Sequence, residues 1–164
     1  MRYLVKKANQ EEIPLIQDLI FEIYPATYGE ILEQAQIDFM LDKSYSAEGL
    51  LHSMNSGQDF YLLYDSAESP LGFIALQHKE DVILRIEKLY MRPLTQGKGL
   101  GKLLIDFAEQ EAKQRQRTTL ELNVNRNNKA YYFYLKQGFT VIAEVDIPYY
   151  GFVLDDYILQ KKLD

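Results

Sequence analysis

The sequence has no cysteine among its 164 residues and only two histidines. The absence of cysteine excludes disulfide bonds, cysteine-ligated zinc and a thiol nucleophile, and it is compatible with a reducing cytoplasm. His52 and His78 are too few and too far apart in the sequence to indicate a metal site, so we expect no metal. Any catalytic groups must come from other residue types.

Long apolar runs are also missing. None approaches the roughly 20 residues that a membrane helix needs, and the first residues carry charges too early for a signal peptide. We therefore expect a cytoplasmic protein with no membrane partner. The net charge of −6 does not favour a nucleic-acid surface. An apolar content of 47% is typical of a globular protein, and the length predicts a single domain over residues 1–164.

The hydrophobic periodicity changes between helical and strand patterns along the chain, and it predicts a mixed α/β (α+β) sheet. Pro25 is expected to end the first helix, so residues 24–29 are expected as a loop. Residues 146–151 are expected as a second loop. The expected strands are 2–7, 60–64, 71–78, 81–91, 119–124, 139–145 and 152–161, and the expected helices begin near 9, 30, 46, 99 and 129.

One stretch, residues 87–112, organises the rest of the chain. An apolar strand runs into the turn Gln96-Gly97-Lys98-Gly99-Leu100-Gly101-Lys102, and an amphipathic helix follows directly. Glycines let a backbone approach a ligand closely, and the first turn of a helix has N–H groups without intrahelical partners. The combination predicts a site for a phosphate or another anion.

Two common phosphate loops do not match this stretch. A Walker A loop requires Ser or Thr after Gly-Lys, but Leu103 follows Gly101-Lys102. A dinucleotide loop requires a third glycine where Lys102 stands. Glu121 does lie about 20 residues further on, as a dinucleotide fold would require, but inside an expected strand rather than at its end.

A third pattern, Gln/Arg-x-x-Gly-x-Gly/Ala, is matched by Gln96, Gly99 and Gly101. It resembles the acetyl-CoA pyrophosphate loop of the GNAT superfamily of N-acetyltransferases. The segment from Asn125 to Phe139 resembles the second signature of that superfamily, in the same order along the chain. The detailed similarity covers about residues 81–145, the expected acetyl-CoA-binding core, and residues 1–58 match only as a helical, substrate-side portion.

The resemblance implies a GNAT-like fold, with a central twisted sheet of about seven strands, four or more helices, and splayed strands 4 and 5 that bind acetyl-CoA. The acetyl group would pass to an amine in a ternary complex, and CoA would be the product. The positions that match the cofactor contacts of the family are Leu89, Tyr90, Met91, Gln96, Gly97, Lys98, Gly99, Leu100, Gly101, Lys102, Asn127, Ala130, Tyr134 and Lys136.

The resemblance also points to two catalytic residues. Tyr134 matches the general acid that protonates the departing thiolate, and Glu87 matches a carboxylate that takes the proton of the amine, directly or through water. Glu87 has a structural alternative as a strand residue paired with Arg85 or Lys88. Tyr134 could be an ordinary helix tyrosine, and Asn127 could be a helix N-cap. Other candidates for the base are Glu121, Asp155 and Asp156.

The acceptor is expected to meet tyrosines and a carboxylate, which can hold a cation. The candidate residues are Tyr24, Tyr28, Glu121, Tyr149 and Tyr150. A small-molecule amine of the polyamine kind fits this set best. The alternatives are an acetyltransferase for protein N-termini or lysines, and a sensor that binds acyl-CoA without turnover. A homodimer is a further expectation from the family.

Overall fold

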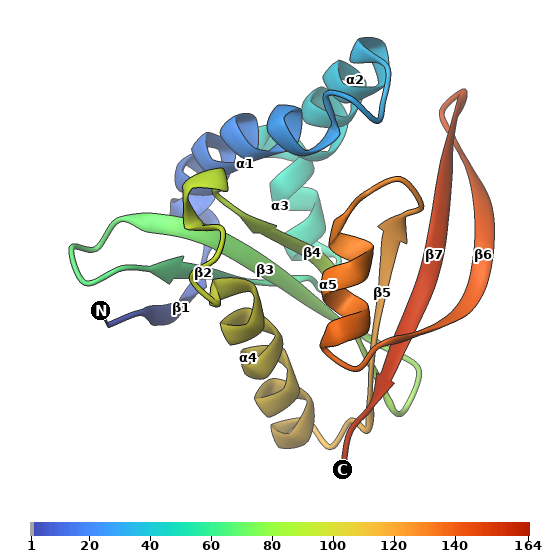
Figure 1. Cartoon of the computed structure of the whole chain (residues 1–164). Helices are drawn as coiled ribbons and strands as arrows, with labels where there is room; N and C mark the ends of the chain where they lie inside the picture. The colour runs from blue at the N-terminus through green and yellow to red at the C-terminus, as the bar shows by residue number, and fades with distance from the viewer. Residues whose placement is uncertain (1) are drawn as a thin grey trace. The chain divides into compact units, whose positions relative to one another are not determined.

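The computed structural model describes residues 2–164, which form seven strands and five α-helices (Figure 1). The strands are β1 (Leu4–Ala8), β2 (Asp59–Tyr64), β3 (Pro70–Lys79), β4 (Ile83–Met91), β5 (Thr119–Asn125), β6 (Thr140–Tyr149) and β7 (Phe152–Lys162). The helices are α1 (Ile13–Tyr28), α2 (Gln34–Ser44), α3 (Ala47–Asn55), α4 (Leu100–Gln114) and α5 (Ala130–Lys136), with short 3-10 turns η1 (Gln10–Glu12) and η2 (Pro93–Thr95).

The strands hydrogen-bond in the order β1-β2-β3-β4-β5-β7-β6. Strands β4 and β5 pair in parallel, and their register runs from Ile83–Thr119 to Ile86–Leu122. The pairs β1–β2, β2–β3, β5–β7 and β6–β7 are antiparallel. The predicted mixed sheet is therefore confirmed.

The chain forms two compact units, and neither is a continuous stretch. The first comprises the chain up to Gln77 together with Glu87–Gly101, and the second comprises His78–Ile86 and Lys102–Asp164. Strand β4 therefore contributes its first residues to one unit and its last residues to the other.

The core of the first unit is built from α1, α2, α3 and the strands β2 and β3. Each fully buried aliphatic or aromatic side chain contributes about 1.5–3 kcal/mol through removal from water. Helical spacing places the apolar face of α1 inward, and strands that are covered on both faces carry continuous apolar runs. The fully buried members include Ile16, Ile20, Leu50, Phe60, Leu62 and Phe73.

The second unit contains α4, α5 and the strands β5, β6 and β7. The buried face of α4 carries apolar residues at helical spacing, and β5 is buried at every position except the half-buried Asn123. The β6–β7 hairpin extends beyond the end of β5 (Figure 1), because the last β5–β7 pair joins Asn125 and Asp156.

The prediction that Pro25 ends the first helix is wrong, because α1 continues to Tyr28. Proline removes one backbone donor and normally bends or breaks a helix. Here Ile23 and Tyr24 are buried just before it, and the Gly29 N–H donates to the Pro25 carbonyl at 2.8 Å. Packing on both sides of the proline maintains the helix. Tyr24 and Tyr28 are thus helix residues, not loop residues.

The predicted loop at 146–151 is also shorter than expected. Strand β6 continues to Tyr149, and the turn consists of Tyr150 and Gly151, with φ values of 49° and 87°. Two consecutive residues at positive φ suit the right-handed twist of a two-residue hairpin. Asp146 and Pro148 remain in the strand because β6 lies at the edge of the sheet, where a proline removes no inner hydrogen bond.

The helix starts at Asn9 and Ser46 are confirmed. The Asn9 N–H donates to the Glu12 carboxylate at 2.8 Å, and the Gly49 N–H donates to the Ser46 hydroxyl at 3.1 Å. Each contact gives a hydrogen-bond acceptor to a backbone N–H at a helix start, where no intrahelical partner is available.

Candidate active site

The glycine loop joins η2 to the start of α4. Gly97 and Gly99 have φ values of 80° and 73°, and no atom lies within 4 Å of where a Cβ would stand on either residue. The left-handed backbone favours glycine, and the open space leaves the loop backbone accessible. Helix α4 begins at Leu100, so its first N–H groups lie directly after this loop. The loop therefore fits an anionic group such as a pyrophosphate.

Two hydrogen bonds of Thr95 hold the entry to the loop. The Thr95 hydroxyl, on a residue that is 4% exposed, donates to the Arg92 carbonyl at 2.6 Å. The Lys98 N–H donates to the Thr95 carbonyl at 3.3 Å, so this amide is already engaged. The Lys102 ammonium pairs with Asp106 at 2.8 Å one turn along α4. The loop conformation is therefore fixed by Thr95, a residue that the motif did not single out.

The end of β4 lies unusually close to β3. A Cβ on Gly72 would collide with the Tyr90 carbonyl oxygen and would lie 3.1 Å from the Met91 Cα. Only glycine permits this approach of two backbones. Gly72 thus sets the position of the segment from Leu89 to Met91, which the family resemblance implies to be in contact with the cofactor.

Tyrosines surround the Tyr90 side chain. The ring centroids of Tyr24 and Tyr45 lie 6.1 and 6.4 Å from that of Tyr90, and Tyr24 lies 4.5 Å from Tyr28. Burial raises the pKa of Tyr90 well above its ordinary value, and the hydrogen bond with Tyr28 adds to the shift. Tyr24 is only 4% exposed and belongs to the core of its unit. Tyr24 therefore lies in the helical core rather than on the expected loop, and its contact with the acceptor stays a prediction.

Lys88 and Glu87 are neighbours on β4 with different surroundings. The Lys88 ammonium donates to the Gln58 side chain at 2.5 Å and lies 5.3 Å from the centre of the Phe60 ring. Burial lowers the pKa of Lys88 to about 8, and the nearby Glu87 carboxylate opposes that shift. Lys88 therefore binds the side-chain amide of Gln58, which lies between α3 and β2. Because side chains alternate along a strand, Glu87 points to the opposite face of β4.

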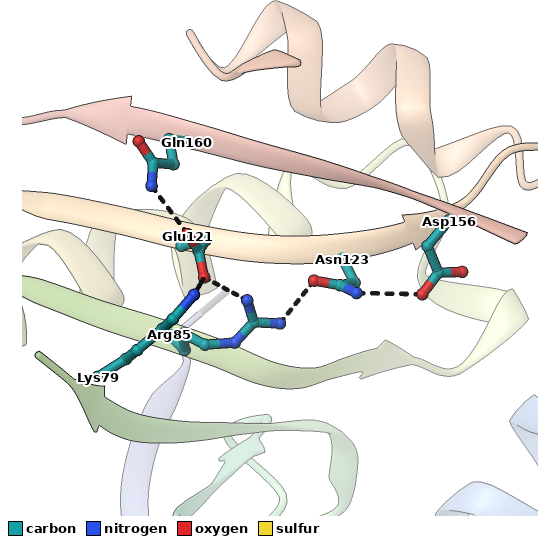
Figure 2. A network of polar contacts seen from close by, with 6 residues as sticks. All are labelled: Lys79, Arg85, Glu121, Asn123, Asp156 and Gln160. Carbon is teal, nitrogen blue, oxygen red and sulfur yellow. Dashed lines mark hydrogen bonds and ion pairs between the residues drawn. The ribbon is translucent and has the colours of Figure 1, made fainter. Parts of the chain in front are cut away.

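Glu121 lies at the centre of a polar network on β3, β4, β5 and β7 (Figure 2). Its side chain is 2% exposed and accepts hydrogen bonds from Lys79 and Gln160, each at 2.8 Å, and from Arg85. Burial raises the pKa of this carboxyl, but the three donors outweigh burial and the net pKa is lowered. A buried carboxylate with three donors is a weak base, which counts against the suggested roles of Glu121 in catalysis and acceptor binding.

The network continues from Arg85 to a second carboxylate. Arg85 Nη2 donates to Asn123 Oδ1 at 2.7 Å, and Asn123 Nδ2 donates to Asp156 Oδ2 at 3.2 Å. Burial raises the pKa of Asp156, the Asp155 charge adds to this, and the Asn123 bond and the charges of Arg126 and Arg85 oppose it. Asp156 thus has an amide donor rather than an ion-pair partner.

The start of α5 is held by asparagine side chains. Asn128 Oδ1 accepts from the Ala130 N–H at 2.9 Å, and Asn125 Oδ1 accepts from the Asn127 N–H at 2.8 Å. The side-chain contact at the helix start therefore comes from Asn128 and not from Asn127, the suggested N-cap. The predicted cofactor contacts Asn127, Ala130 and Lys136 remain predictions.

Tyr134 is buried on the same helix. It is 8% exposed, and its ring lies 5.3 Å from that of Phe133 and 5.8 Å from that of Phe139.

Tyr149 and Tyr150 form an edge-to-face pair at 4.8 Å by the hairpin turn, where Tyr150 is 64% exposed. The structure thus places Tyr134, Asn127 and Tyr149 in the second unit, and Glu87, Leu89 and the glycine loop in the first.

Comparison with known proteins decides the family. The model of the acetyltransferase (GNAT) domain matches residues 30–152, which is most of the chain. This chain belongs to the GNAT acetyltransferase family. It is an N-acetyltransferase by class, and the fold and enzyme class expected from its two motifs are confirmed.

Relatives in the GNAT family are similar along their whole length. A spermidine N(1)-acetyltransferase from Thermoplasma acidophilum is 29% identical over 98% of this chain and 97% of its own. The crystal structure of the PaiA N-acetyltransferase of that organism, in complex with coenzyme A, has a TM-score of 0.84 at 26% identity, with 99% of each chain covered. A GNAT acetyltransferase from Staphylococcus aureus shares the fold, with a TM-score of 0.75 over 99% of this chain and all of its own.

Within residues 2–164, no group of three or more His, Asp and Glu side chains could hold a metal ion. Across the same part of the chain, no helix is long and apolar enough to span a membrane.

Sequence reasoning did not find Gly72 or the contact between Asn123 and Asp156. A glycine inside an apolar strand is a signal of close backbone approach, and it could have pointed to Gly72. The Asn123 contact depends on the register of three strands, which no local pattern specifies.

Proposed function

We propose that this protein transfers the acetyl group of acetyl-CoA to a primary amine of a small, polyamine-like molecule. The observation that carries the proposal is the glycine loop at the start of α4. Its left-handed glycines and open backbone fit a pyrophosphate. The similarity to a spermidine N(1)-acetyltransferase and to a structure that contains coenzyme A supports both the acceptor and the cofactor.

Bound acetyl-CoA would supply an activated acetyl thioester. The loop from Gln96 to Lys102 would hold its pyrophosphate, and the backbone of Leu89 to Met91 would hold its pantetheine arm and polarise the thioester carbonyl. Asn127, Ala130 and Lys136 would add contacts from the second motif. These roles follow from the match to the family motifs and from the accessible loop backbone.

The proton transfers would need two side chains. Glu87 would accept a proton from the acceptor ammonium, directly or through water, so that the nitrogen lone pair can form the new N–C bond. Tyr134 would donate a proton to the sulfur as the C–S bond breaks, and the second proton that the nitrogen loses as the amide forms would return the phenol to its neutral state. Glu87 is preferred over Glu121 as the base because three donors occupy Glu121 and lower its pKa.

Thiol release from acetyl-CoA across an acceptor panel tests the proposal. The panel contains spermidine, a simple monoamine, a peptide with a primary N-terminus and a peptide with an internal lysine. We expect release with spermidine well above the rate without acceptor. Preferential release with a peptide would favour the protein acetyltransferase. Tight acetyl-CoA binding without release for any acceptor would favour the sensor and contradict the proposal.

A Glu87→Gln variant tests the base. We expect kcat to fall by about 10²-fold at neutral pH, within the usual range for removal of a general base, while acetyl-CoA affinity changes little. Glu22→Gln is the matched control, since Glu22 is 44% exposed and pairs with Arg92 on the surface. Unchanged kcat in Glu87→Gln over the whole pH profile would remove Glu87 from the mechanism.

A further inference from the structure

The β6–β7 hairpin has two unlike faces where it extends beyond β5 (Figure 1). Along β6 the exposed residues Glu144, Asp146 and Pro148 alternate with half-buried Val145 and Ile147. Side chains directly opposite each other on paired strands share a face. Val145 pairs with Asp156, and Ile147 pairs with Leu154. One face of the hairpin therefore carries half-buried apolar side chains around a single carboxylate, Asp156.

The orientation of the amide next to Asp156 is determined by Arg85. An arginine has only donors, so the Asn123 oxygen must face Arg85 and the Asn123 nitrogen must face Asp156. Figure 2 shows the resulting row, with Asp156 at its end and its second carboxylate oxygen directed away from Asn123. Among residues 2–164, Asn123 is the one side chain that donates to this carboxylate.

The charged side chains near Asp156 form their hydrogen bonds and ion pairs with other residues. Arg85 binds Glu121 and Asn123, and Arg126 binds Glu144 at 3.1 Å and also Asp146. Asp155, the neighbouring acid, accepts from Asn125 at 3.1 Å. Burial and Asp155 both raise the pKa of Asp156, and a cation at its second oxygen would oppose both effects. A half-buried carboxylate among apolar side chains is therefore suited to an external ammonium group.

We propose that Asp156 binds an ammonium group of an aliphatic polyamine acceptor, while the adjoining methylene groups lie over Val145, Ile147 and Leu154. The proposal rests on the proposed acetyl transfer and names the carboxylate that recognises its acceptor. Asp156 is a binding residue in this scheme. Asn123 is a positioning residue, because it acts through Asp156.

Asp156→Asn is the direct test, because asparagine keeps the shape and can still accept from Asn123. Spermidine is titrated by calorimetry into the CoA-saturated protein, and KM and kcat are measured with spermidine and acetyl-CoA. We expect spermidine affinity to fall about tenfold to a hundredfold, the usual effect of losing a charged hydrogen bond, with KM for acetyl-CoA unchanged. Asn123→Ala should produce a smaller loss of the same kind.

Glu144→Gln is the matched control. This substitution removes one negative charge, as Asp156→Asn does, but from the opposite face of the same hairpin, where the Glu144 side chain is 61% exposed. It should leave spermidine affinity within about twofold of wild type, as expected for an exposed ion pair. A thermal melt of each variant separates recognition from folding. If Asp156 only stabilised the sheet, Asp156→Asn would lower Tm and leave spermidine affinity unchanged, which overturns the proposal.

The result for the wild type separates this proposal from the one it rests on. Wild-type protein that binds no aliphatic polyamine but releases thiol with another amine would overturn the role of Asp156 and leave acetyl transfer standing. Wild-type protein that binds spermidine through Asp156 but never releases thiol would support the site and contradict acetyl transfer. Equal loss of spermidine affinity in Asp156→Asn and Glu144→Gln would show only general attraction by an acidic protein, and would also overturn the proposal.

Discussion

Tyr134 is almost completely buried among aromatic rings, yet its proposed task requires the hydroxyl to reach a sulfur atom. The rings of Phe133 and Phe139 pack against the phenol ring, and a phenylalanine would keep both contacts. A tyrosine held in this way keeps its rotamer when the hydroxyl is removed. Tyr134→Phe should therefore test chemistry rather than folding.

We expect Tyr134→Phe to lower kcat by about 10²-fold and to change KM for acetyl-CoA little, because the lost group acts only as the thiolate departs. Steady-state kinetics over a range of pH provide the measurement. Tyr132→Phe is the control from the same helix, since that ring is 65% exposed. Full kcat in Tyr134→Phe at every pH would show that another group protonates the sulfur.

At this scale the sequence indicated residue types well and side-chain environments poorly. Glu121 and Asp156 were both candidate bases, and nothing local separates them. Their difference arises because β3, β4 and β7 place three donors on Glu121, whereas β5 places one amide on Asp156. These partners are 33 to 42 residues apart along the chain, so they depend on strand register.

At the scale of elements, the glycine loop combines backbone conformation with ligand access. Gly99→Ala forces a side chain into a left-handed conformation, at a cost of about 1 kcal/mol. We expect KM for acetyl-CoA to rise several-fold, while kcat at saturation falls less. Kinetics with acetyl-CoA as the varied substrate measure the change.

Gly57→Ala separates strain from function. Gly57 has a φ of 107° at the end of α3, and a Cβ there would lie 3.5 Å from the Gln77 side chain, an ordinary contact. Both variants should lose similar stability, but only Gly99→Ala should raise KM for acetyl-CoA. Equal KM values would mean that the loop backbone does not meet the cofactor.

Gly72→Ala tests the close approach of β3 and β4. Its added methyl group would collide with the Tyr90 carbonyl, and relief of such overpacking costs about 1–3 kcal/mol. We expect a lower free energy of unfolding and a lower kcat, because the Leu89–Met91 backbone must move. Gly29→Ala makes a useful comparison: a Cβ there would also meet a backbone oxygen, 2.7 Å away, but at the end of α1. A variant at Gly72 with wild-type kcat would exclude this positioning role.

Element order and type were predictable because long periodic segments and caps such as Ser46 and Asn9 are local signals. Two boundaries were not. Pro25 lies inside α1 because neighbouring residues are packed in the core, and β6 extends to Tyr149 because β7 pairs with it along that length. In both cases tertiary contacts override the local signal.

At the scale of the whole molecule, the Glu121 network links four strands through a charge that is 2% exposed. Glu121→Gln leaves Arg85 and Lys79 without their carboxylate, and we expect the free energy of unfolding to fall by about 3 kcal/mol at pH 7. The surface variant Glu22→Gln should cost less than about 1 kcal/mol. Urea unfolding at neutral pH measures both.

The stability from Glu121 should also depend on pH. The folded-state pKa is lower than the ordinary value of 4.5, so the unfolded chain binds the proton first as pH falls. The contribution is complete above that ordinary value and is lost as pH falls through the folded-state pKa. The difference between wild type and Glu121→Gln should therefore shrink in acid. A difference that is constant from pH 7 to pH 3 would contradict the lowered pKa.

The order in which strands are made differs from the order in which they pair. Strand β7 follows β6 along the chain but lies between β5 and β6 in the sheet, and the first unit needs residues 87–101 in addition to the chain up to Gln77. A ribosome that has made everything up to Gly151 has therefore produced β4 for one edge of β5 but no partner for the other edge, which pairs with β7. The pairings of β5 and β6 with β7 must wait for the segment after Gly151, so this fold completes late in synthesis and depends on contacts of long sequence separation.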